Sequence, residues 1–504
     1  MNKLLASDLK KAKSISFENI IDSTMLPLPS FRRLKKLGWL AEIIRGWYIL
    51  KTPDVQVGES TLWYANFWSF LRCYLEKNYK NNYCLNPTSS LLLKTDSAII
   101  PKQVVIVLSH GGTRTLNLLF DTSLFFYVEK TNFPTDIEKV NGISTVELSK
   151  ALTLVPESFF SNYEIEAELA LSMVKNPADL TKHLLDNGQP SKADILAGAY
   201  EFLKKDNFVK QIKLDMELLP HLVHPKNPFL KAIPSLAVSK VTNPAVSRIE
   251  VLWKKHREFL IEHFPSPRGK NSSIDNVISE VEKIYIHDAY NSLSIEGYVV
   301  TEELIQKVAS GNFDSEANAD DKKQTGALAA KGYYLAFLEV KKFIKDNFEI
   351  LPEKIQYQNA LQNWYQKLFT PSVQAGISNA SLLVGYRNKP VFIRGSRHVP
   401  VNFSIVAEVM DKFFELLELE TSPKAKAILG HFILVYIHPF SDGNGRTARF
   451  LMNAILILSG YHWTVVRHER RKEYFMALEE ASVHGNIEAF NHFIIEEMKA
   501  SELS

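Results

Sequence analysis

The chain has few cysteines, no long apolar run and almost no excess of charge. Only Cys73 and Cys84 occur among 504 residues, too few for a disulfide framework and wrongly spaced for a metal site. The net charge is +3, so any contact with nucleic acid must rest on local charge. No stretch approaches the roughly 20 apolar residues of a membrane span, and the start MNKLLASDLKK lacks the apolar core of a secretory signal. We therefore expect a cytoplasmic protein with no membrane partner.

The length and the 46% share of hydrophobic residues indicate several globular domains. We predict a mainly α protein. Residues 264–273 are rich in Pro, Gly and Ser and are the best candidate for a linker. The predicted parts are a winged helix-turn-helix at 1–55, a mixed α/β region at 56–263, this linker, and a helical catalytic domain at 274–504.

The segment HPFSDGNGRTAR, from His438 to Arg449, concentrates a base, a carboxylate, two glycines and two arginines. Apolar stretches predict helices over 425–437 and 450–458, and Pro439 excludes His438 from helical backbone. The segment between them is predicted to be a glycine-bearing turn that opens the second helix. Such a turn points unpaired N–H groups outward at the positive end of the helix dipole, so it indicates an anion site.

The side chains of this segment suit a nucleotide. Arg446 and Arg449 are three residues apart on a helix, so they share a face and can each hold a phosphate. The Asp442 carboxylate can bind Mg²⁺ beside phosphate oxygens. With an ordinary pKa of about 6.5, His438 is mostly neutral at pH 7 and can accept a proton. These groups together indicate attack of a hydroxyl group on a nucleotide phosphate.

The same segment resembles the HPFx[D/E]GNGRxxR motif of the Fic (Fido) family at every fixed position. Enzymes of this family move AMP from ATP onto a hydroxyl side chain of a protein. The resemblance implies a Fic-type helical core, with ATP and Mg²⁺ as cofactors. It also implies a target protein and self-modification, and an oligomer is possible. It implies His438 as the general base and Asp442 as the metal ligand. The implied ATP contacts are Asp442, Gly443, Asn444, Gly445, Arg446, Thr447, Ala448 and Arg449.

A second stretch fits the inhibitory pattern (S/T)xxxE(G/N) of this family, with Ser292, Glu296 and Gly297 in the fixed positions. On the residues alone, a helix that begins at Ile274 ends here at a glycine. The resemblance implies that Glu296 pairs with Arg449 and keeps it from the γ-phosphate.

The resemblance also implies a flap and a nucleoside pocket. Residues 389–400 read as an extended, hairpin-like segment, and in the family such a flap receives the target as an added strand. Its central residues are Ile393, Arg394, Gly395 and Ser396. Glu473 and Tyr474 fall where the family contacts the nucleoside. Ala481 departs from relatives that carry asparagine at the corresponding position.

The N-terminal region is locally basic, with six basic residues and one acid from Phe31 to Lys51. We predict a helix with Phe17, Ile20 and Ile21 on one face, a helix capped by Ser30, and a hairpin around Arg45-Gly46. This layout is typical of a winged helix-turn-helix and is similar to the start of AbiEi-type antitoxins. The residues predicted to contact DNA are Arg32, Arg33, Lys35, Lys36 and Arg45. The same module could equally dock a protein.

These patterns leave three functions open. The leading interpretation is transfer of AMP from ATP to a protein hydroxyl, inhibited by Glu296. One alternative is removal of AMP by the same site. Another is a DNA-binding regulator or antitoxin whose Fic core senses a nucleotide.

Overall fold

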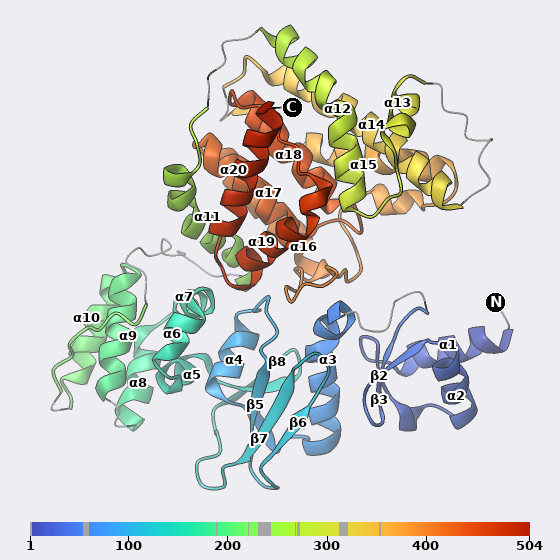
Figure 1. Ribbon diagram of the computed structural model, residues 1–504. Coiled ribbons are helices and arrows are strands. Elements are labelled where there is room, and N and C mark those ends of the chain that lie inside the picture. Colours follow the sequence, from blue (N-terminus) through green and yellow to red (C-terminus); the bar gives the residue numbers. More distant parts are fainter. Residues whose placement is uncertain are drawn as a thin grey trace. The chain divides into compact units, whose positions relative to one another are not determined.

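The computed structural model describes residues 3–53, 60–187, 190–219, 221–229, 243–267, 269, 273–311, 321–351 and 354–503. The chain divides into two compact units, which we describe separately (Figure 1). Unit 1 comprises Met1–Arg248 and Phe392–Val399, and unit 2 comprises Ile249–Val391 and Pro400–Ser504. Across the described ranges, no helix is long and apolar enough to cross a membrane.

Unit 1 begins with two helices and a small antiparallel sheet of strand order β1-β3-β2. The hairpin predicted around Arg45-Gly46 is confirmed, and its register is set by pairs such as Ala41 with Ile49. The elements are α1 (Lys3–Ile15), β1 (Ile20–Asp22), η1 (Ser23–Met25), α2 (Leu28–Lys36), β2 (Leu40–Ile44) and β3 (Trp47–Leu50).

The helix predicted around Phe17, Ile20 and Ile21 is wrong, because Ile20 and Ile21 lie in strand β1. Consecutive strand residues point to opposite faces, and here both faces are covered. Ile20 packs into a core with Trp63, whereas Ile21 packs into a core with Leu9. Two adjacent buried residues fit a short buried strand as well as a helix face, so the apolar pattern alone could not distinguish a strand from a helix here. Ser30 lies inside α2 and does not cap it; the N-cap is Pro27.

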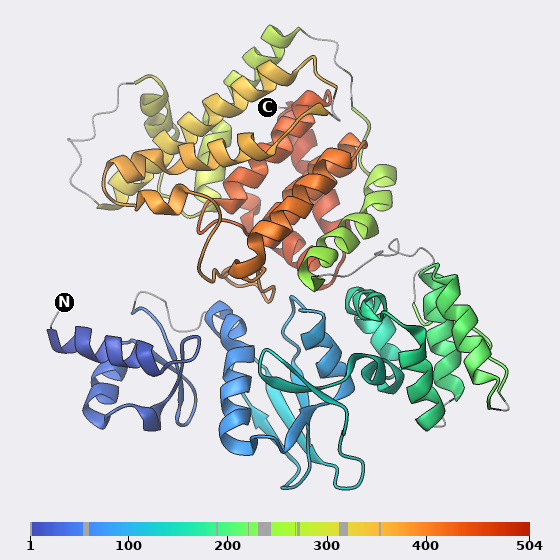
Figure 2. The same ribbon diagram turned by 180° about the vertical axis from the view of Figure 1, so that it is seen from behind.

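The middle of unit 1 is a mixed sheet of order β4-β5-β7-β6, in which β5 and β7 run parallel. Helix α3 packs on it through aromatic residues, among them Trp63, Phe67 and Phe70 (Figure 2). The elements are α3 (Ser60–Tyr79), β4 (Tyr83–Leu85), α4 (Pro87–Lys94), β5 (Gln103–Leu108), β6 (Arg114–Asn117), β7 (Ser123–Val128), and the hairpin β8 (Ile137–Val140) and β9 (Ile143–Val146).

The last part of unit 1 is helical and has its own apolar core, which includes Phe159, Leu171 and Tyr200. The elements are α5 (Leu148–Leu154), α6 (Ser158–Asn162), α7 (Glu164–Met173), α8 (Pro177–Asn187), α9 (Pro190–Phe202) and α10 (Asp206–Met216).

Unit 2 is built from helices around the adjacent pair α17 (Pro423–Ile437) and α18 (Asn444–Leu458) (Figure 1). Almost every residue of these two helices is buried, which fits their apolar sequences. The other elements are α11 (Pro244–His263), α12 (Ile274–Ile295), α13 (Glu302–Ala309), α14 (Asp321–Asn347), α15 (Gln358–Gln374), η3 (Ala380–Leu383), η4 (Phe403–Ile405), α16 (Val406–Leu419), η5 (His468–Arg470), α19 (Arg471–Val483) and α20 (Glu488–Leu503).

The division between the units falls within α11, ahead of the predicted linker at 264–273, part of which lies outside the described residues. Most of α11 goes with unit 2 because it is tied there by polar contacts. Trp253 Nε1 and Arg257 Nε both donate to the buried Glu420 carboxylate, at 3.0 and 2.8 Å. A helix with such bonds moves with its partner, whatever the composition of the loop that follows it.

Candidate active site

The loop between α17 and α18 bends sharply at two residues with left-handed backbone. His438, the C-cap of α17, has φ 55°, and Gly443, the N-cap of α18, has φ 79°. The first is uncommon for a residue with a side chain, and the second suits glycine. The predicted turn that opens a helix is therefore confirmed, and α18 begins at Asn444. The backbone N–H groups of its first turn lie at the positive end of the helix.

Side chains of the motif itself hold this loop in shape. Asn444 Nδ2 donates to the Phe440 carbonyl and Asn444 Oδ1 accepts from the Phe440 N–H, both at 2.9 Å. Thr447 Oγ1 donates to the carbonyl of Gly443 at 2.9 Å. Phe440 stacks on Tyr365 with ring centroids 3.8 Å apart. The side chains of Asn444 and Thr447 are thus occupied in building the loop, which leaves their backbone to contact a ligand.

Arg446 is buried close to the loop, with 1% of its surface exposed. Its Nη2 donates to Asp442 Oδ1 at 3.1 Å, and its guanidinium lies over the rings of Tyr298 and Phe369, each 5.1 Å away. Within the described residues, its Nε atom has no hydrogen-bond partner. A buried cation with an unused donor is costly unless an anion completes it.

Arg449 is also buried, and it binds the predicted inhibitory segment. Its Nε donates to Ser292 Oγ at 2.8 Å, and its Nη2 donates to the Ser292 carbonyl at 3.2 Å and to Glu296 Oε1 at 2.8 Å. Its Nη1 has no hydrogen-bond partner in the described part of the chain. The resemblance implied this pairing of Glu296 with Arg449, and the structure places the two groups in contact.

Gly297 explains how Glu296 reaches the arginine. It has φ 88° and ends α12 with two bonds, Gly297 N to Ser294 O at 3.0 Å and Tyr298 N to Leu293 O at 3.1 Å. This ending makes Glu296 the C-cap of the helix, with its carboxylate over the start of α18. A Cβ atom on Gly445 would lie 2.6 Å from Glu296 Oε1, which shows how closely the carboxylate approaches the first turn.

The His438 imidazole is held in one orientation and made a weaker base than expected. Its Nδ1 lies 3.2 Å from the Val435 carbonyl, the distance of an N–H donor, which leaves Nε2 as the basic nitrogen. Desolvation, with a smaller effect of the Arg387 charge, lowers the pKa of His438 to about 4. The expected pKa near 6.5 is therefore wrong, although the conclusion that the ring is neutral at pH 7 holds.

Arg387 contacts the site, although no role was predicted for it from the sequence. Its Nε donates to the His438 carbonyl at 2.7 Å, and its backbone N–H donates to the Pro439 carbonyl at 2.9 Å. Its Nη2 donates to the Val401 carbonyl. Burial lowers the pKa of Arg387 to about 10. These contacts join segments that are distant in the sequence, so no local pattern predicts them.

The remaining predicted residues fall in different surroundings. Tyr474 is buried and its hydroxyl lies 2.9 Å from His431 Nε2, whereas Glu473 is exposed and pairs with Arg470 at 2.5 Å. The flap residues Ile393, Arg394, Gly395 and Ser396 belong to unit 1. The segment turns at these residues, where the Ser396 N–H donates to the Ile393 carbonyl at 3.1 Å, and after the turn His398 forms a bridge with Ile99.

The residues present suit a nucleotide with Mg²⁺. Among the described residues, no group of three His, Cys, Asp or Glu side chains could hold a metal alone. Mg²⁺ bound with a nucleotide needs only one or two carboxylates besides phosphate oxygens, and the Asp442 side chain is 57% exposed beside Arg446. Asp442 would hold Mg²⁺, and the unused nitrogens of Arg446 and Arg449 would hold phosphates.

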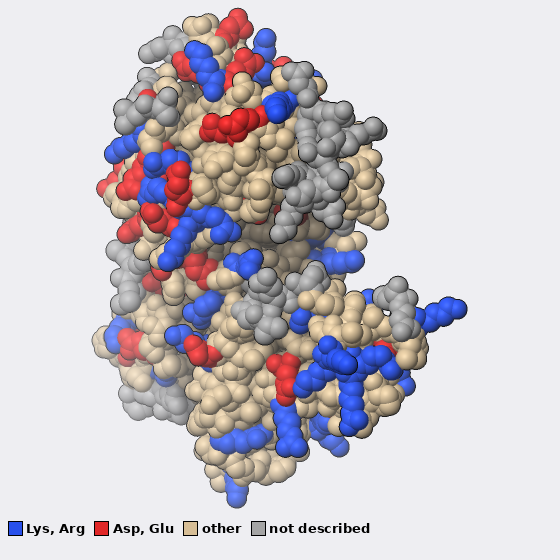
Figure 3. All heavy atoms as spheres, turned by 45° about the vertical axis from the view of Figure 1, so that its right-hand side comes forward, with Lys and Arg blue, Asp and Glu red and all other residues tan. Residues whose placement is uncertain are grey.

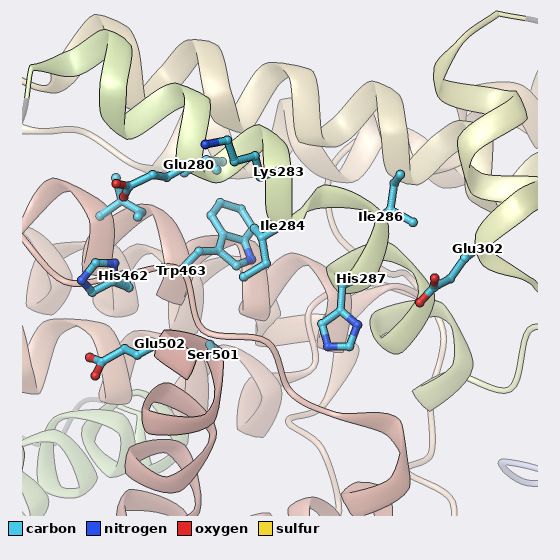
Figure 4. Close-up of a pocket in the computed structure, with 12 residues that line it drawn as sticks. Glu280, Lys283, Ile284, Ile286, His287, Glu302, His462, Trp463, Ser501 and Glu502 are labelled. Atoms are coloured by element: carbon cyan, nitrogen blue, oxygen red, sulfur yellow. The ribbon is translucent and has the colours of Figure 1, made fainter. Parts of the chain in front are cut away.

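Unit 2 also contains a cavity of about 660 Å³ away from this loop (Figure 4). Residues 280–287 of α12 form one wall, with Glu302, His462 and Trp463 around it. None of its lining residues belongs to the segment from His438 to Arg449. We therefore assign the chemistry to the loop between α17 and α18.

Residues 357–456 match the sequence pattern of the Fic/DOC family. The chain contains a Fic domain. It is 42% identical over 114 residues to the protein adenylyltransferase Fic of Nematostella vectensis, covering 22% of this chain and 26% of that protein. It is 28% identical over 229 residues to the protein of the same name from Culex quinquefasciatus, covering 44% and 42%. The chain thus spans less than half of the length of these curated relatives.

Solved structures of Fic proteins are also similar to the chain. Fic-1 of C. elegans superimposes with a TM-score of 0.36 at 16% identity, covering 70% of this chain and 89% of that one. A Fic-domain signalling protein of Bacteroides thetaiotaomicron gives a TM-score of 0.38 at 18% identity, covering 51% and 93%. The Fic domain contains the loop from His438 to Arg449, whereas Ser292 and Glu296 lie before it in the sequence.

We predict that His438 titrates near pH 4 in the folded chain. Burial disfavours the imidazolium, so the folded pKa lies below the unfolded value near ~6.5. The unfolded chain therefore binds more protons between these values, and this group lowers the free energy of unfolding as the pH falls from 6.5 towards 4. The measurement is NMR titration of the His438 ring, with the resonance assigned by its loss in His438→Ala. A His438 midpoint near 6.5 would contradict the surroundings described here.

Proposed function

We propose that this protein transfers AMP from ATP to a hydroxyl side chain of a protein. The observation that carries the proposal is the pair of buried arginines, each with an unused nitrogen, at the start of a helix and beside a neutral histidine. The cations and the helix N-terminus attract phosphates, and the histidine supplies a base. The match of residues 357–456 to the Fic/DOC family, with relatives named protein adenylyltransferase, supports the same reaction.

The residues would divide the reaction as follows. His438 Nε2 takes the proton of the target hydroxyl, and the hydroxyl oxygen attacks the α-phosphorus of ATP. The bond from this phosphorus to the bridging oxygen breaks, and pyrophosphate leaves while AMP stays on the target. Arg446, Arg449 and the N–H groups of the first turn of α18 stabilise the negative charge of the phosphates. Mg²⁺ held by Asp442 would neutralise part of that charge.

We further propose that Glu296 inhibits the transfer. Its carboxylate occupies one nitrogen of Arg449 and approaches Gly445 in the first turn of α18. A γ-phosphate would compete with the carboxylate for the same cation, since two anions repel each other at that distance. ATP could then bind only with displaced phosphates, and a misplacement of about 1 Å lowers a rate on the order of 10²-fold.

Removal of AMP from a modified protein is a second reaction that the same groups could perform. In that reaction water replaces the target hydroxyl, and Glu296 would orient it. The contact of Glu296 with Arg449 is compatible with both reactions, so a variant of Glu296 separates them.

We predict that His438→Ala lowers AMP transfer by roughly 10²–10⁴-fold, because it removes the base. Affinity for ATP should change little, since other residues bind the phosphates. The assay follows α-labelled ATP into protein in the Glu296→Gly chain, with ATP affinity measured by calorimetry. His484→Ala, which removes an exposed histidine of the same unit, is the matched control and should transfer normally. Equal transfer by the two variants would remove His438 from the mechanism.

We predict that Glu296→Gly raises AMP transfer strongly, with self-modification as the first readout, and that Arg449→Ala cancels the gain. The first change frees the Arg449 guanidinium for the γ-phosphate, and the second removes it. If removal of AMP is the native reaction, Glu296→Gly abolishes that hydrolysis. Glu303→Gln, an exposed acid on α13, is the control for loss of negative charge. A folded, ATP-binding Glu296→Gly chain with neither activity altered would refute the inhibitory role.

The N-terminal region supports a second function, which is binding to DNA. We propose a winged helix-turn-helix here, with α2 as the reading helix. The order of a helix, a strand, the short η1, helix α2 and the hairpin β2–β3 supports this proposal. Lys and Arg side chains gather over this region (Figure 3). Arg32, Lys36 and Arg45 are exposed, whereas Arg33 pairs with Asp8 at 2.5 Å and Lys35 pairs with Glu42 at 2.7 Å.

We predict that Arg32→Glu with Lys36→Glu weakens binding of random double-stranded DNA. Losing two phosphate contacts lowers the slope of log affinity against log salt by about 2. Fluorescence anisotropy of a labelled duplex across a salt series measures this slope. Lys210→Glu with Lys213→Glu on α10 makes the same charge change at two exposed lysines elsewhere in unit 1. If both pairs of changes weaken binding equally, α2 is not the binding surface.

A further inference from the structure

The flap segment is paired with a turn of unit 1 that lies almost 300 residues earlier in the sequence. The Val399 N–H donates to the Ala98 carbonyl at 2.9 Å, and His398 forms an antiparallel bridge with Ile99. Arg397 Nη2 donates to the Ile100 carbonyl at 3.3 Å. The Val399 side chain packs against the core that contains Trp63 and Ile100. Backbone, charge and apolar contacts therefore all hold residues 397–399.

The turn at residues 95–100 is itself firmly anchored. Arg248 Nη2 donates to the carbonyls of Thr95 and Asp96 at 2.8 and 3.2 Å, and its Nη1 pairs with Glu166 at 2.9 Å. Ser97 Oγ donates to the same Glu166 carboxylate at 3.0 Å. Arg248 and Glu166 are both buried, where a hydrogen-bonded ion pair fixes geometry well. A flap attached to this turn is attached to the rigid part of unit 1.

The two arms of the flap differ in exposure. Ser396 and His398 are buried, whereas Arg394 and Gly395 are exposed and Phe392 is 37% exposed. The turn at 95–100 thus covers the second arm and leaves the first arm open to solvent. An exposed extended segment held at one end can still accept another strand.

The chain enters unit 2 directly after the covered arm. Val401 is two residues after Val399, a span of at most about 7 Å along the chain. The Val401 carbonyl accepts a bond from Arg387, and Arg387 in turn donates to the His438 carbonyl. One buried side chain of unit 2 therefore holds both the residue that follows the flap and the carbonyl of the base.

We infer that residues 97–100 act as a built-in partner strand that positions the flap for docking of a target protein. The inference rests on the proposed AMP transfer and assigns unit 1 a part in target binding. The flap is ordered before the target arrives, so the target need not supply the ordering free energy. The first arm stays open for the target backbone, while residues 397–399 remain bound to unit 1 throughout the reaction.

The first test joins the paired segments by a disulfide, using Ile99→Cys with His398→Cys in the Glu296→Gly chain. Opposed residues of an antiparallel pair have Cα atoms about 4.5–5.5 Å apart, within the range of a disulfide. The native thiols should interfere little, because burial raises the pKa of Cys73 to about 11 and that of Cys84 to about 12. Each single cysteine variant is the matched control.

The acceptor in this test is the His438→Ala copy of the same chain, with α-labelled ATP as donor. We expect the disulfide to form under mild oxidation and transfer by the oxidised chain to stay within about 2-fold of that by the reduced chain. Absence of the disulfide would overturn the pairing. A loss of more than about 10-fold on oxidation, with ATP affinity unchanged, would show that the flap must leave unit 1, and this also overturns the inference.

The second test releases the flap with Val399→Asp, which places a charge in the apolar core. We expect faster hydrogen exchange at residues 396–399 and about a 10-fold rise in KM for the acceptor, with KM for ATP unchanged. Val399→Ile, which keeps an apolar side chain, should leave the hydrogen exchange and the KM for the acceptor as in the parent chain. Val384→Asp, at a valine that is 75% exposed, is the control for the added charge. Unchanged exchange and KM in Val399→Asp overturn the inference. If the parent chain transfers no AMP, the proposed function is refuted instead. The disulfide and hydrogen-exchange results then still show whether residues 397–399 pair with residues 97–100.

Discussion

The buried charge of Arg449 is the constraint on which the arrangement of the catalytic helices depends. A guanidinium taken out of water has to be compensated by an anion and by acceptors for its N–H groups. Ser292 and Glu296 provide part of this from the end of α12, which brings that helix onto the start of α18. One nitrogen still lacks a partner among the described residues. The pair is thus incomplete, and a phosphate could complete it or replace the carboxylate.

The local part of this site could be predicted from the sequence because its causes are local. Pro439 and Gly443 fix where α17 ends and α18 begins, and the inhibitory helix ends at Gly297 for the same reason. Contacts between distant segments could not be predicted in this way. A backbone bridge such as that of Ile99 and His398 uses no side-chain pattern, so nothing in either segment names its partner. Short buried strands such as β1 also lack the length that distinguishes a strand from a helix.

The pKa of His438 could not be predicted from the sequence either. The sequence supplies a histidine, but its pKa depends on how much water and which charges surround the ring. Desolvation and the charge of Arg387, fifty-one residues earlier, both disfavour the imidazolium. Arg387 is itself bound to the carbonyls of His438 and Val401. Its charge therefore holds the loop by hydrogen bonds and at the same time keeps the nearby histidine neutral.

A base with a pKa near 4 is a poor proton acceptor at pH 7, and the proposed reaction resolves this through the substrate itself. Desolvation and the positive charge of Arg387 lower the pKa of His438. A triphosphate at the start of α18 brings several negative charges to the same loop, and negative charge nearby favours the imidazolium. In the proposed reaction, bound ATP would therefore raise the pKa of His438, and general-base catalysis is most efficient when the pKa lies near the working pH. The charge of Arg387, which also holds the loop, thus keeps the histidine weakly basic, and the phosphates of a bound nucleotide would oppose this effect.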